Sequence, residues 1–147
     1  MIGGKNRSIV YLGYPADGKI HDYELLKKDL PPSVHWFKGL VVHVDLGYQG
    51  IESDYSTQWK SDTTILIPFK KKKGEAQLDC LKKAYNKKLS QWRVRVEHAI
   101  GGMKRYRILA ERIRIKSRQQ VNLIMEVCAG LWNFRVRVKE SQALNAL

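Results

Sequence analysis

Glu97 is the one acidic residue in the strongly basic stretch from Arg93 to Arg105. Arg93 lies four residues before it and Lys104 seven residues after it, so on an α-helix the three side chains share one stripe. A carboxylate among cations suits a salt bridge with Arg93, worth roughly 0.2–0.5 kcal/mol. It also suits a metal ligand at a site that handles phosphate groups. Taken alone, such a glutamate is more often the salt-bridge partner.

Asp45 is the second carboxylate in an informative position. It follows the apolar run Leu40–Val44, and the carboxyl end of a strand faces the crevice where α/β sheets bind ligands. Gly47 and Gly50 behind it would let backbone or nucleic acid approach closely. An aspartate before a glycine-bearing turn also commonly bonds its own backbone, and for Asp45 alone that simpler interpretation is favoured.

Asp45 and Glu97 are more suggestive together, because the chain as a whole is so basic. Its 27 Lys and Arg residues outnumber 14 Asp and Glu, which gives a net charge of +13 and a pI near 9.9. This charge favours a polyanionic partner, DNA first, since each neutralised phosphate releases counterions. Carboxylates are the ligands that Mg²⁺ (or Mn²⁺) takes, and paired metal ions stabilise the attacking and leaving oxygens of phosphodiester cleavage.

Further cations extend the expected nucleic-acid surface. Lys70 and Lys71 begin a lysine run, and Arg105 and Arg107 continue the basic stretch beyond Glu97. A charge run is usually a solvated surface, yet these four side chains add to the field that attracts phosphate. A basic protein associated with the ribosome would also explain the charge, but it would leave the placement of Asp45 and Glu97 as coincidence.

Composition narrows the class of protein. A chain of 147 residues is the size of one domain. Cys80 and Cys128 are far apart in sequence, which indicates thiols in a reducing cytosol rather than a disulfide framework or a zinc site. No apolar run is long enough to cross a membrane, and the first residues lack the apolar segment of a signal peptide. We therefore expect a cytoplasmic protein with no membrane partner.

The pattern of apolar and turn residues predicts an α/β domain. We expect strands at 8–13, 40–44 and 63–68, a short helix at 23–28 capped by Asp22, a long helix from about 76 to 106 and a last helix at about 119–136. The last helix would present Val121, Ile124, Met125, Cys128, Leu131 and Trp132 as its apolar face. Three strands are few for such a sheet and would leave exposed edges.

Four blocks of the chain resemble, in order, the DDE transposases of bacterial insertion sequences, which are related to the Harbinger-type nucleases. They are Gly18–Asp22, Val44–Gly50, Ile67–Lys71 and a last block from Asn86 to Leu109. The last is the most specific, because Arg93, Glu97 and Lys104 reproduce the Arg-x3-Glu-x6-Lys signature of that family. Ser90 stands where the family pattern often has a tyrosine.

This resemblance implies a ribonuclease-H-like fold and Mg²⁺-dependent cutting and joining of DNA at transposon ends. Asp45 would be the second acid of the DDE triad and Glu97 the third, both as metal ligands. Arg93 and Lys104 would match the basic residues that position the transposon end.

The first aspartate of the triad has no convincing counterpart. In the family it lies on an early strand upstream of the block at 18–22, and neither Asp17 nor Asp22 follows an apolar strand in that way. We therefore expect residues 1–147 to be a partial catalytic domain whose first strands are missing. The helix at about 119–136 would be part of this same domain. Such a chain would be inactive alone and would need an N-terminal transposase half or a second copy. The alternative is a non-catalytic, basic nucleic-acid-binding remnant.

Overall fold

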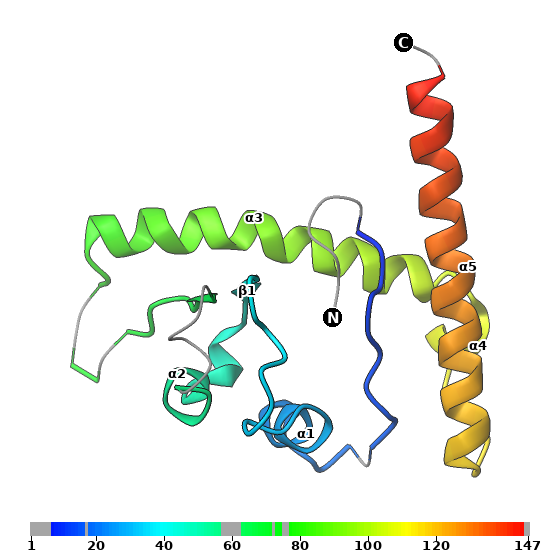
Figure 1. Cartoon of the computed structure of the whole chain (residues 1–147), viewed down its shortest axis with the longest axis horizontal. Coiled ribbons are helices and arrows are strands. Elements are labelled where there is room, and N and C mark those ends of the chain that lie inside the picture. The colour runs from blue at the N-terminus through cyan, green and yellow to red at the C-terminus, as the bar shows by residue number, and fades with distance from the viewer. Residues whose placement is uncertain (1–6, 17, 57–62, 72, 75–76, 146–147) are drawn as a thin grey trace. The chain divides into compact units, whose positions relative to one another are not determined.

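The computed structural model describes residues 7–16, 18–56, 63–71, 73–74 and 77–145. Its elements, in order, are α1 (Asp22–Asp29), β1 (Val41–His43), the 3₁₀ turn η1 (Leu46–Tyr48), α2 (Ile51–Asp54), β2 (Thr64–Leu66), α3 (Cys80–Met103), α4 (Arg107–Ala110) and α5 (Arg118–Leu144) (Figure 1). The chain forms two compact units. We call Ala16–Trp92 the sheet unit, and Met1–Pro15 with Arg93–Leu147 the helical unit.

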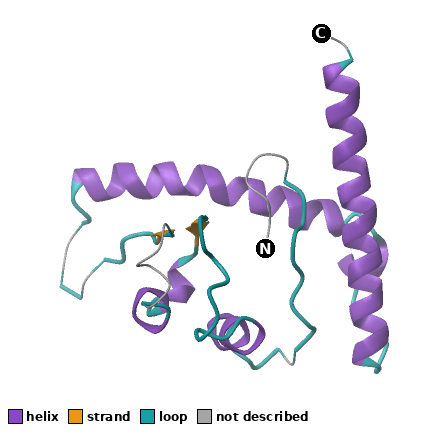
Figure 2. Cartoon of the chain, in the orientation of Figure 1, coloured by secondary structure: helices purple, strands orange, loops and turns teal. Residues whose placement is uncertain are grey.

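The sheet unit has three layers built around two parallel strands. β1 pairs with β2 in the register Val42↔Ile65. The core is formed by Tyr23, Leu30, Phe37, Ile51 and Tyr55. Val42 of β1 and Ile65 of β2 pack onto it, together with Val44 and Ile67 just beyond the strand ends. On the opposite face of β1, the His43 ring stacks on Trp92 of α3, with 4.9 Å between ring centroids. Figure 2 shows α1 and α2 on one side of the strands and the first part of α3 on the other.

These layers, with helices on both sides of a small parallel sheet, are compatible with the expected α/β class. Parallel strands are covered by helices on both faces, because each crossover connection returns along one face of the sheet. The sheet of the described residues has two strands, however, where three were expected. The strands at 40–44 and 63–68 are present with bounds shorter by about a residue at each end.

The expected strand at Ser8–Gly13 is wrong. Within it only Ile9 is assigned to a β-bridge, and the other residues belong to neither a strand nor a helix. The backbone N–H and carbonyl of Ile9 are both hydrogen-bonded to the side chain of Asn133 in α5. The Ile9 N–H donates to Asn133 Oδ1 at 2.7 Å, and Asn133 Nδ2 donates to the Ile9 carbonyl at 2.8 Å. A side-chain amide supplies one donor and one acceptor, as a neighbouring strand does, so a single residue can be held this way.

The cap of α1 also differs from the expectation. His21, not Asp22, is the N-cap, and its Nδ1 accepts a hydrogen bond from the Tyr23 N–H at 3.3 Å. Asp22 becomes the first helical residue, where its negative charge is favoured by the helix dipole. The helix ends at Asp29, immediately before Leu30 and the two prolines, as expected.

The helical unit is formed by the second part of α3, by α4 and by α5. Its core consists of Ile9, Ala99, Met103, Cys128 and Ala129, with Ile124 and Trp132 packed against them. Three of the six residues of the expected apolar face of α5, Ile124, Cys128 and Trp132, therefore belong to this core, whereas Leu131 is 47% exposed. α5 extends eight residues beyond Val136, the end that was expected, because no glycine or proline interrupts Arg137–Leu144.

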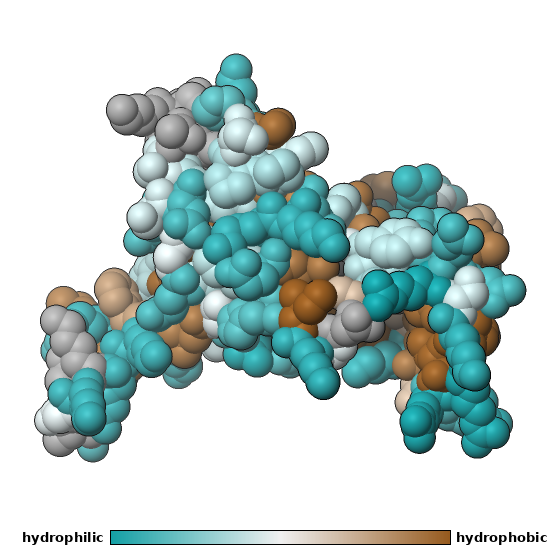
Figure 3. Space-filling model, turned by 90° about the horizontal axis from the view of Figure 1, so that it is seen from below, coloured by the Kyte–Doolittle hydropathy of each residue, from teal (hydrophilic) through white to brown (hydrophobic). Residues whose placement is uncertain are grey.

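None of the helices in the described part of the chain has a stretch long and apolar enough to cross a bilayer. Figure 3 shows one face of the molecule, on which hydrophilic side chains predominate and separate apolar patches lie between them.

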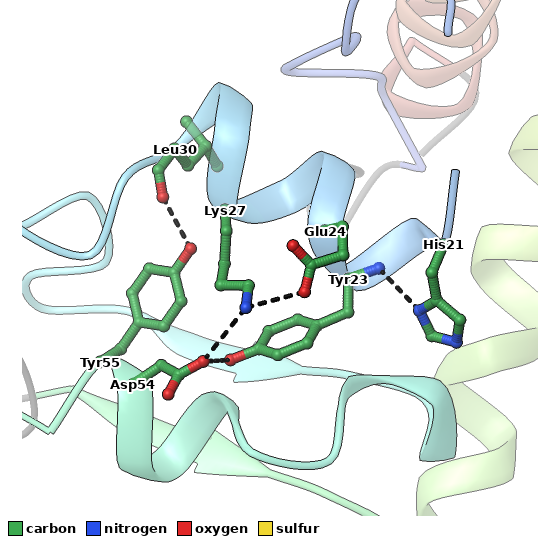
Figure 4. Close-up of polar contacts among 7 residues, drawn as sticks. All are labelled: His21, Tyr23, Glu24, Lys27, Leu30, Asp54 and Tyr55. Atoms are coloured by element: carbon green, nitrogen blue, oxygen red, sulfur yellow. Dashed lines mark hydrogen bonds and ion pairs between the residues drawn. The ribbon is translucent and has the colours of Figure 1, made fainter. Parts of the chain in front are cut away.

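A polar cluster ties α1 to α2 in the sheet unit (Figure 4). The Tyr23 hydroxyl donates to Asp54 Oδ2 at 2.7 Å, and Lys27 Nζ lies 2.8 Å from Glu24 and 3.6 Å from Asp54. The buried Tyr55 hydroxyl donates to the carbonyl of Leu30 at 2.6 Å. Helix α1 is thereby fixed at both its first and its last turn.

Alkaline pH is expected to destabilise the sheet unit. Burial raises the pKa of Tyr23, Tyr48 and Tyr55, and for Tyr23 the hydrogen bond to Asp54 raises it further. The unfolded chain ionises its tyrosines near pH ~10, whereas the folded state holds these protons. Below that pH the three tyrosines make their full contribution to the free energy of unfolding. The contribution is lost as the pH rises toward and through their raised pKa values in the folded state.

Urea unfolding followed at a series of pH values from neutral to strongly alkaline measures this effect. Tyr23→Phe should make the decline less steep, whereas Tyr14→Phe, at an exposed tyrosine of the helical unit, should leave it unchanged. A free energy of unfolding that does not decline above pH ~10 would contradict the assignment.

Candidate functional site

Asp45 lies where the sequence placed it, directly beyond the carboxyl end of β1. The strand ends at His43, and Val44 still donates its N–H to the Leu66 carbonyl of β2 at 3.2 Å. Because β1 and β2 are parallel, their carboxyl ends meet at one edge of the sheet. This edge is the usual ligand-binding side of an α/β sheet.

The carboxylate of Asp45 is exposed and also caps the turn that follows. Its Oδ1 accepts a hydrogen bond from the Leu46 N–H at 2.8 Å, which makes Asp45 the N-cap of η1. The turn-bonding role considered for this residue is therefore real. A carboxylate has two oxygens with about four lone-pair sites, so one backbone hydrogen bond is compatible with a second role.

Tyr48 is a neighbour that sequence reasoning did not single out. Burial raises its pKa, and the negative charges of Asp22 and Asp45 raise it further. The structure thus brings Asp22, from the 18–22 block, and Asp45, from the 44–50 block, into the surroundings of one phenol. The ring of Tyr23 meets Tyr48 edge-on at 6.0 Å between centroids. These two blocks are therefore packed together in the sheet unit.

Lys70 and Lys71 follow the carboxyl end of β2 and are exposed. The chain before them is anchored to α3, because Phe69 N–H donates to Asn86 Oδ1 at 2.8 Å and Asn86 Nδ2 donates to the Phe69 carbonyl at 3.0 Å. Asp45 and the two lysines consequently leave the same edge of the sheet. The next residue of the lysine run, Lys72, lies outside the described residues.

Glu97 lies in the helical unit, on the exposed side of α3. Its Oε1 pairs with Arg93 Nε at 3.2 Å, and the two side chains are 59% and 62% exposed. The i,i+4 salt bridge expected from the spacing is present. Pairs this exposed contribute only about 0.2–1 kcal/mol, so the carboxylate is held weakly and another cation can compete for it.

The remaining predicted cations are all exposed, but they are held differently. Lys104 and Arg105 follow the last residue of α3, Met103. Arg107 Nη2 pairs with Glu111 at 2.8 Å, another i,i+4 salt bridge. Its charge is already partly neutralised within the chain.

A groove of about 650 Å³ lies between α3 and α5 in the helical unit. The α3 side consists of Glu97, His98, Gly101, Gly102 and, just past the helix end, Arg105. These positions recur every three to four residues, so they form one face of α3 and its continuation. The predicted carboxylate Glu97 and the predicted cation Arg105 therefore belong to the same groove.

The opposite side of the groove is a face of α5 that sequence reasoning missed. Its residues are Trp132, Arg135, Val136, Lys139 and Glu140, and Arg7 joins them from the N-terminal segment. The expected helix ended at Val136, which left Lys139 and Glu140 outside it. The i,i+4 spacing of Arg135 and Lys139 was a signal that could have been read once the helix was extended.

Asp45 and Glu97 belong to different units, and each has been described in its own. Within the described residues, neither unit gathers three or more His, Cys, Asp or Glu side chains that could hold a metal ion. His43 and His98 do not form such a group. Burial lowers the pKa of His43, which is stacked on Trp92, so this imidazole is neutral near pH 7.

Comparison with known proteins identifies the family. Residues 5–133 match the family described as DDE superfamily endonuclease. A protein of Microchaete diplosiphon, described as a probable transposase for insertion sequence element IS702, is 33% identical over 139 residues. The alignment covers 95% of this chain and 46% of that protein, so the chain spans about half the length of its relative. No solved structure matches the chain significantly. The match over most of the chain shows that this protein belongs to the DDE superfamily endonuclease family.

Proposed function

We propose that the chain is part of the catalytic domain of a DDE transposase with a ribonuclease-H-like fold, which cuts and joins DNA at transposon ends. The observation that carries this proposal is the position of Asp45, exposed just beyond the carboxyl end of β1 in a chain of this family. Glu97 supports it, because an exposed glutamate at the expected spacing from Arg93 lines a basic groove.

Asp45 and Glu97 fit the role of ligands for Mg²⁺ (or Mn²⁺). Both are exposed carboxylates, the oxygen donors that these ions take. When bound, the metal would supply electrostatic stabilisation to the oxygens of the phosphodiester that is cut. Asp45 and Glu97 would each offer a carboxylate ligand, and the Leu46 N–H orients that of Asp45.

The basic side chains would bind and orient the DNA. We assign phosphate contacts to Arg93 and Lys104 near Glu97, and to Lys70 and Lys71 at the sheet edge that carries Asp45. Arg105 and Arg107 would extend this surface. Such contacts position the substrate and carry no sequence information by themselves.

The chain by itself would lack the first acid of the triad. Asp22 is the first residue of α1 rather than the end of a strand, and Asp17 lies outside the described residues. We therefore propose that the first aspartate comes from an N-terminal transposase half or another copy, and that the chain alone does not cleave DNA. Cleavage of a matched transposon end by the purified chain in Mg²⁺ would contradict this part of the proposal.

Iron-directed cleavage of the protein backbone tests the two metal ligands. Fe²⁺ with ascorbate and peroxide should cut the purified chain near residues 45 and 97, and excess Mg²⁺ should suppress both cuts. Asp45→Asn should remove the first cut and Glu97→Gln the second. The matched control is Glu111→Gln, since Glu111 is also an exposed glutamate paired at i,i+4 with an arginine. Cuts that are absent at these positions, or unchanged in the variants, would refute the assignment.

A second candidate function is non-catalytic nucleic-acid binding, favoured by the net charge of +13. It predicts salt-sensitive DNA binding that Asp45→Ala and Glu97→Ala leave intact or strengthen. Loss of binding in either variant, with the fold retained, would count against it.

A further inference from the structure

We propose that the groove between α3 and α5 binds the backbone phosphates of DNA, with Arg105, Arg135 and Lys139 as the phosphate contacts. The inference rests on the proposed function in taking DNA as the polyanion. It goes beyond that function by assigning a second wall of the site, on α5, to side chains outside the family signature.

In the described part of the chain, the cations of this groove are not paired with its carboxylates. Among the described residues, no ion pair joins Arg105, Arg135 or Lys139 to Glu97 or Glu140, the two carboxylates of the groove. Glu97 pairs instead with Arg93. With Arg7, four cationic side chains therefore face two acidic ones. Cations that converge on a groove without internal partners attract an anion more strongly than paired ones do.

The shape of the α3 side suits close approach by a sugar–phosphate backbone. Gly101 is exposed, and a methyl group added to it would meet no atom within 4 Å. This part of the wall is therefore bare backbone, which lets a ligand come nearer than any side chain would allow. At the neighbouring Gly102, the ring of Trp132 occupies the space that a side chain would need. This contact sets the distance between α3 and α5.

The α5 side is held in place before any ligand arrives. The indole Nε1 of Trp132 donates to the Arg7 carbonyl at 3.0 Å, and Arg7 adopts φ 60°, a left-handed conformation uncommon outside glycine. Arg135 and Lys139 lie one and two turns further along the same face of α5. The helical backbone that carries Arg135 and Lys139 is therefore ordered, and their exposed side chains extend from it.

Phosphates bound here would lie beside Glu97, which lines the same groove. The groove would thus lead a DNA strand past the carboxylate that we assign to the metal. His98, also on this wall, can donate a hydrogen bond from its ring.

DNA binding measured by fluorescence anisotropy in EDTA tests the groove without any metal. Labelled single-stranded and duplex oligonucleotides of the same sequence are titrated with the full chain over a series of salt concentrations. Each lost phosphate contact lowers the slope of log K against log [salt] by ~1, so Arg135→Gln/Lys139→Gln should lower it by ~2. The matched control is Arg137→Gln, an arginine of α5 that does not line the groove, which should leave the slope unchanged.

A second variant tests the shape without changing the charge. Gly101→Met places a neutral side chain in the open space and also favours helix formation, so the fold should be kept while affinity falls. The oligonucleotide that loses more affinity in both variants identifies the strand form that the groove takes. Equal slopes for the double variant and Arg137→Gln would overturn the proposal, even if the chain binds DNA elsewhere. Because metal is absent, this result is independent of the iron-cleavage test of Asp45 and Glu97.

Discussion

Gly102→Ala is expected to destabilise the helical unit by about 1–3 kcal/mol, whereas Gly101→Ala should stabilise it by up to ~1 kcal/mol. The two glycines are adjacent in the last turn of α3, but only Gly102 is buried. A methyl group on Gly102 would overlap the six-membered ring of Trp132, with Cδ2 at 2.7 Å. Trp132 cannot simply turn away, because its Nε1 is hydrogen-bonded to the Arg7 carbonyl.

The two variants are expected to change stability in opposite directions, although both replace a glycine by alanine, because only Gly102 contacts Trp132. In both cases alanine favours the helix over glycine by a similar amount, so the difference between the variants isolates the contact with Trp132. Thermal and urea unfolding of both variants, followed by tryptophan fluorescence, measures it. A Gly102→Ala variant as stable as Gly101→Ala would show that α3 and α5 do not meet at this position.

The helices could be predicted from the sequence because their signals are local. α3 and α5 contain apolar residues at helical spacing and long runs without glycine or proline, and both were expected. Their ends were predicted less accurately: α3 runs from Cys80 to Met103, where a helix from about 76 to 106 was expected. Lys139 and Glu140 lie past the expected end of α5 because the apolar periodicity fades there, although nothing in the sequence stops the helix.

The positions of Asp45 and Glu97 were also predictable, since each depends only on its own element. Asp45 follows a strand, and Glu97 lies four residues after Arg93 on a helix. The α5 wall of the groove was not predictable, because it depends on which face of α5 turns toward α3. That choice is made by the contact between Gly102 and Trp132, residues 30 positions apart that carry no mutual signal in one sequence.

The expected strand at 8–13 failed for a related reason. An apolar run signals burial, but not the kind of partner that will pair its backbone. Here the partner is Asn133, a side chain in the middle of a helix, and it serves only Ile9. Val10, its neighbour, is 65% exposed. A strand would have needed backbone hydrogen bonds to a neighbouring strand at the residues before and after Ile9 as well.

Asn133→Ala is accordingly expected to cost about 1–3 kcal/mol, the penalty for leaving buried polar groups without partners. It removes both hydrogen bonds to Ile9, which is only 9% exposed, so water cannot easily replace them. The matched control is Asn86→Ala, which removes the same two hydrogen bonds from Phe69. Phe69 is 45% exposed, so water can take over both groups, and the cost should be smaller.

Hydrogen exchange of the Ile9 and Phe69 amides, combined with urea unfolding, measures both effects. Each substitution replaces a helical asparagine by alanine, so the gain in helix propensity cancels in the comparison. In Asn133→Ala the Ile9 amide should exchange much faster, and Arg7 should lose its place beside Trp132, since Ile9 holds the segment that carries it. DNA binding through the groove would then weaken along with stability. Equal costs for the two variants would mean that burial does not decide the strength of these amide pairs, and that the N-terminal segment is held chiefly by the apolar contacts of Ile9.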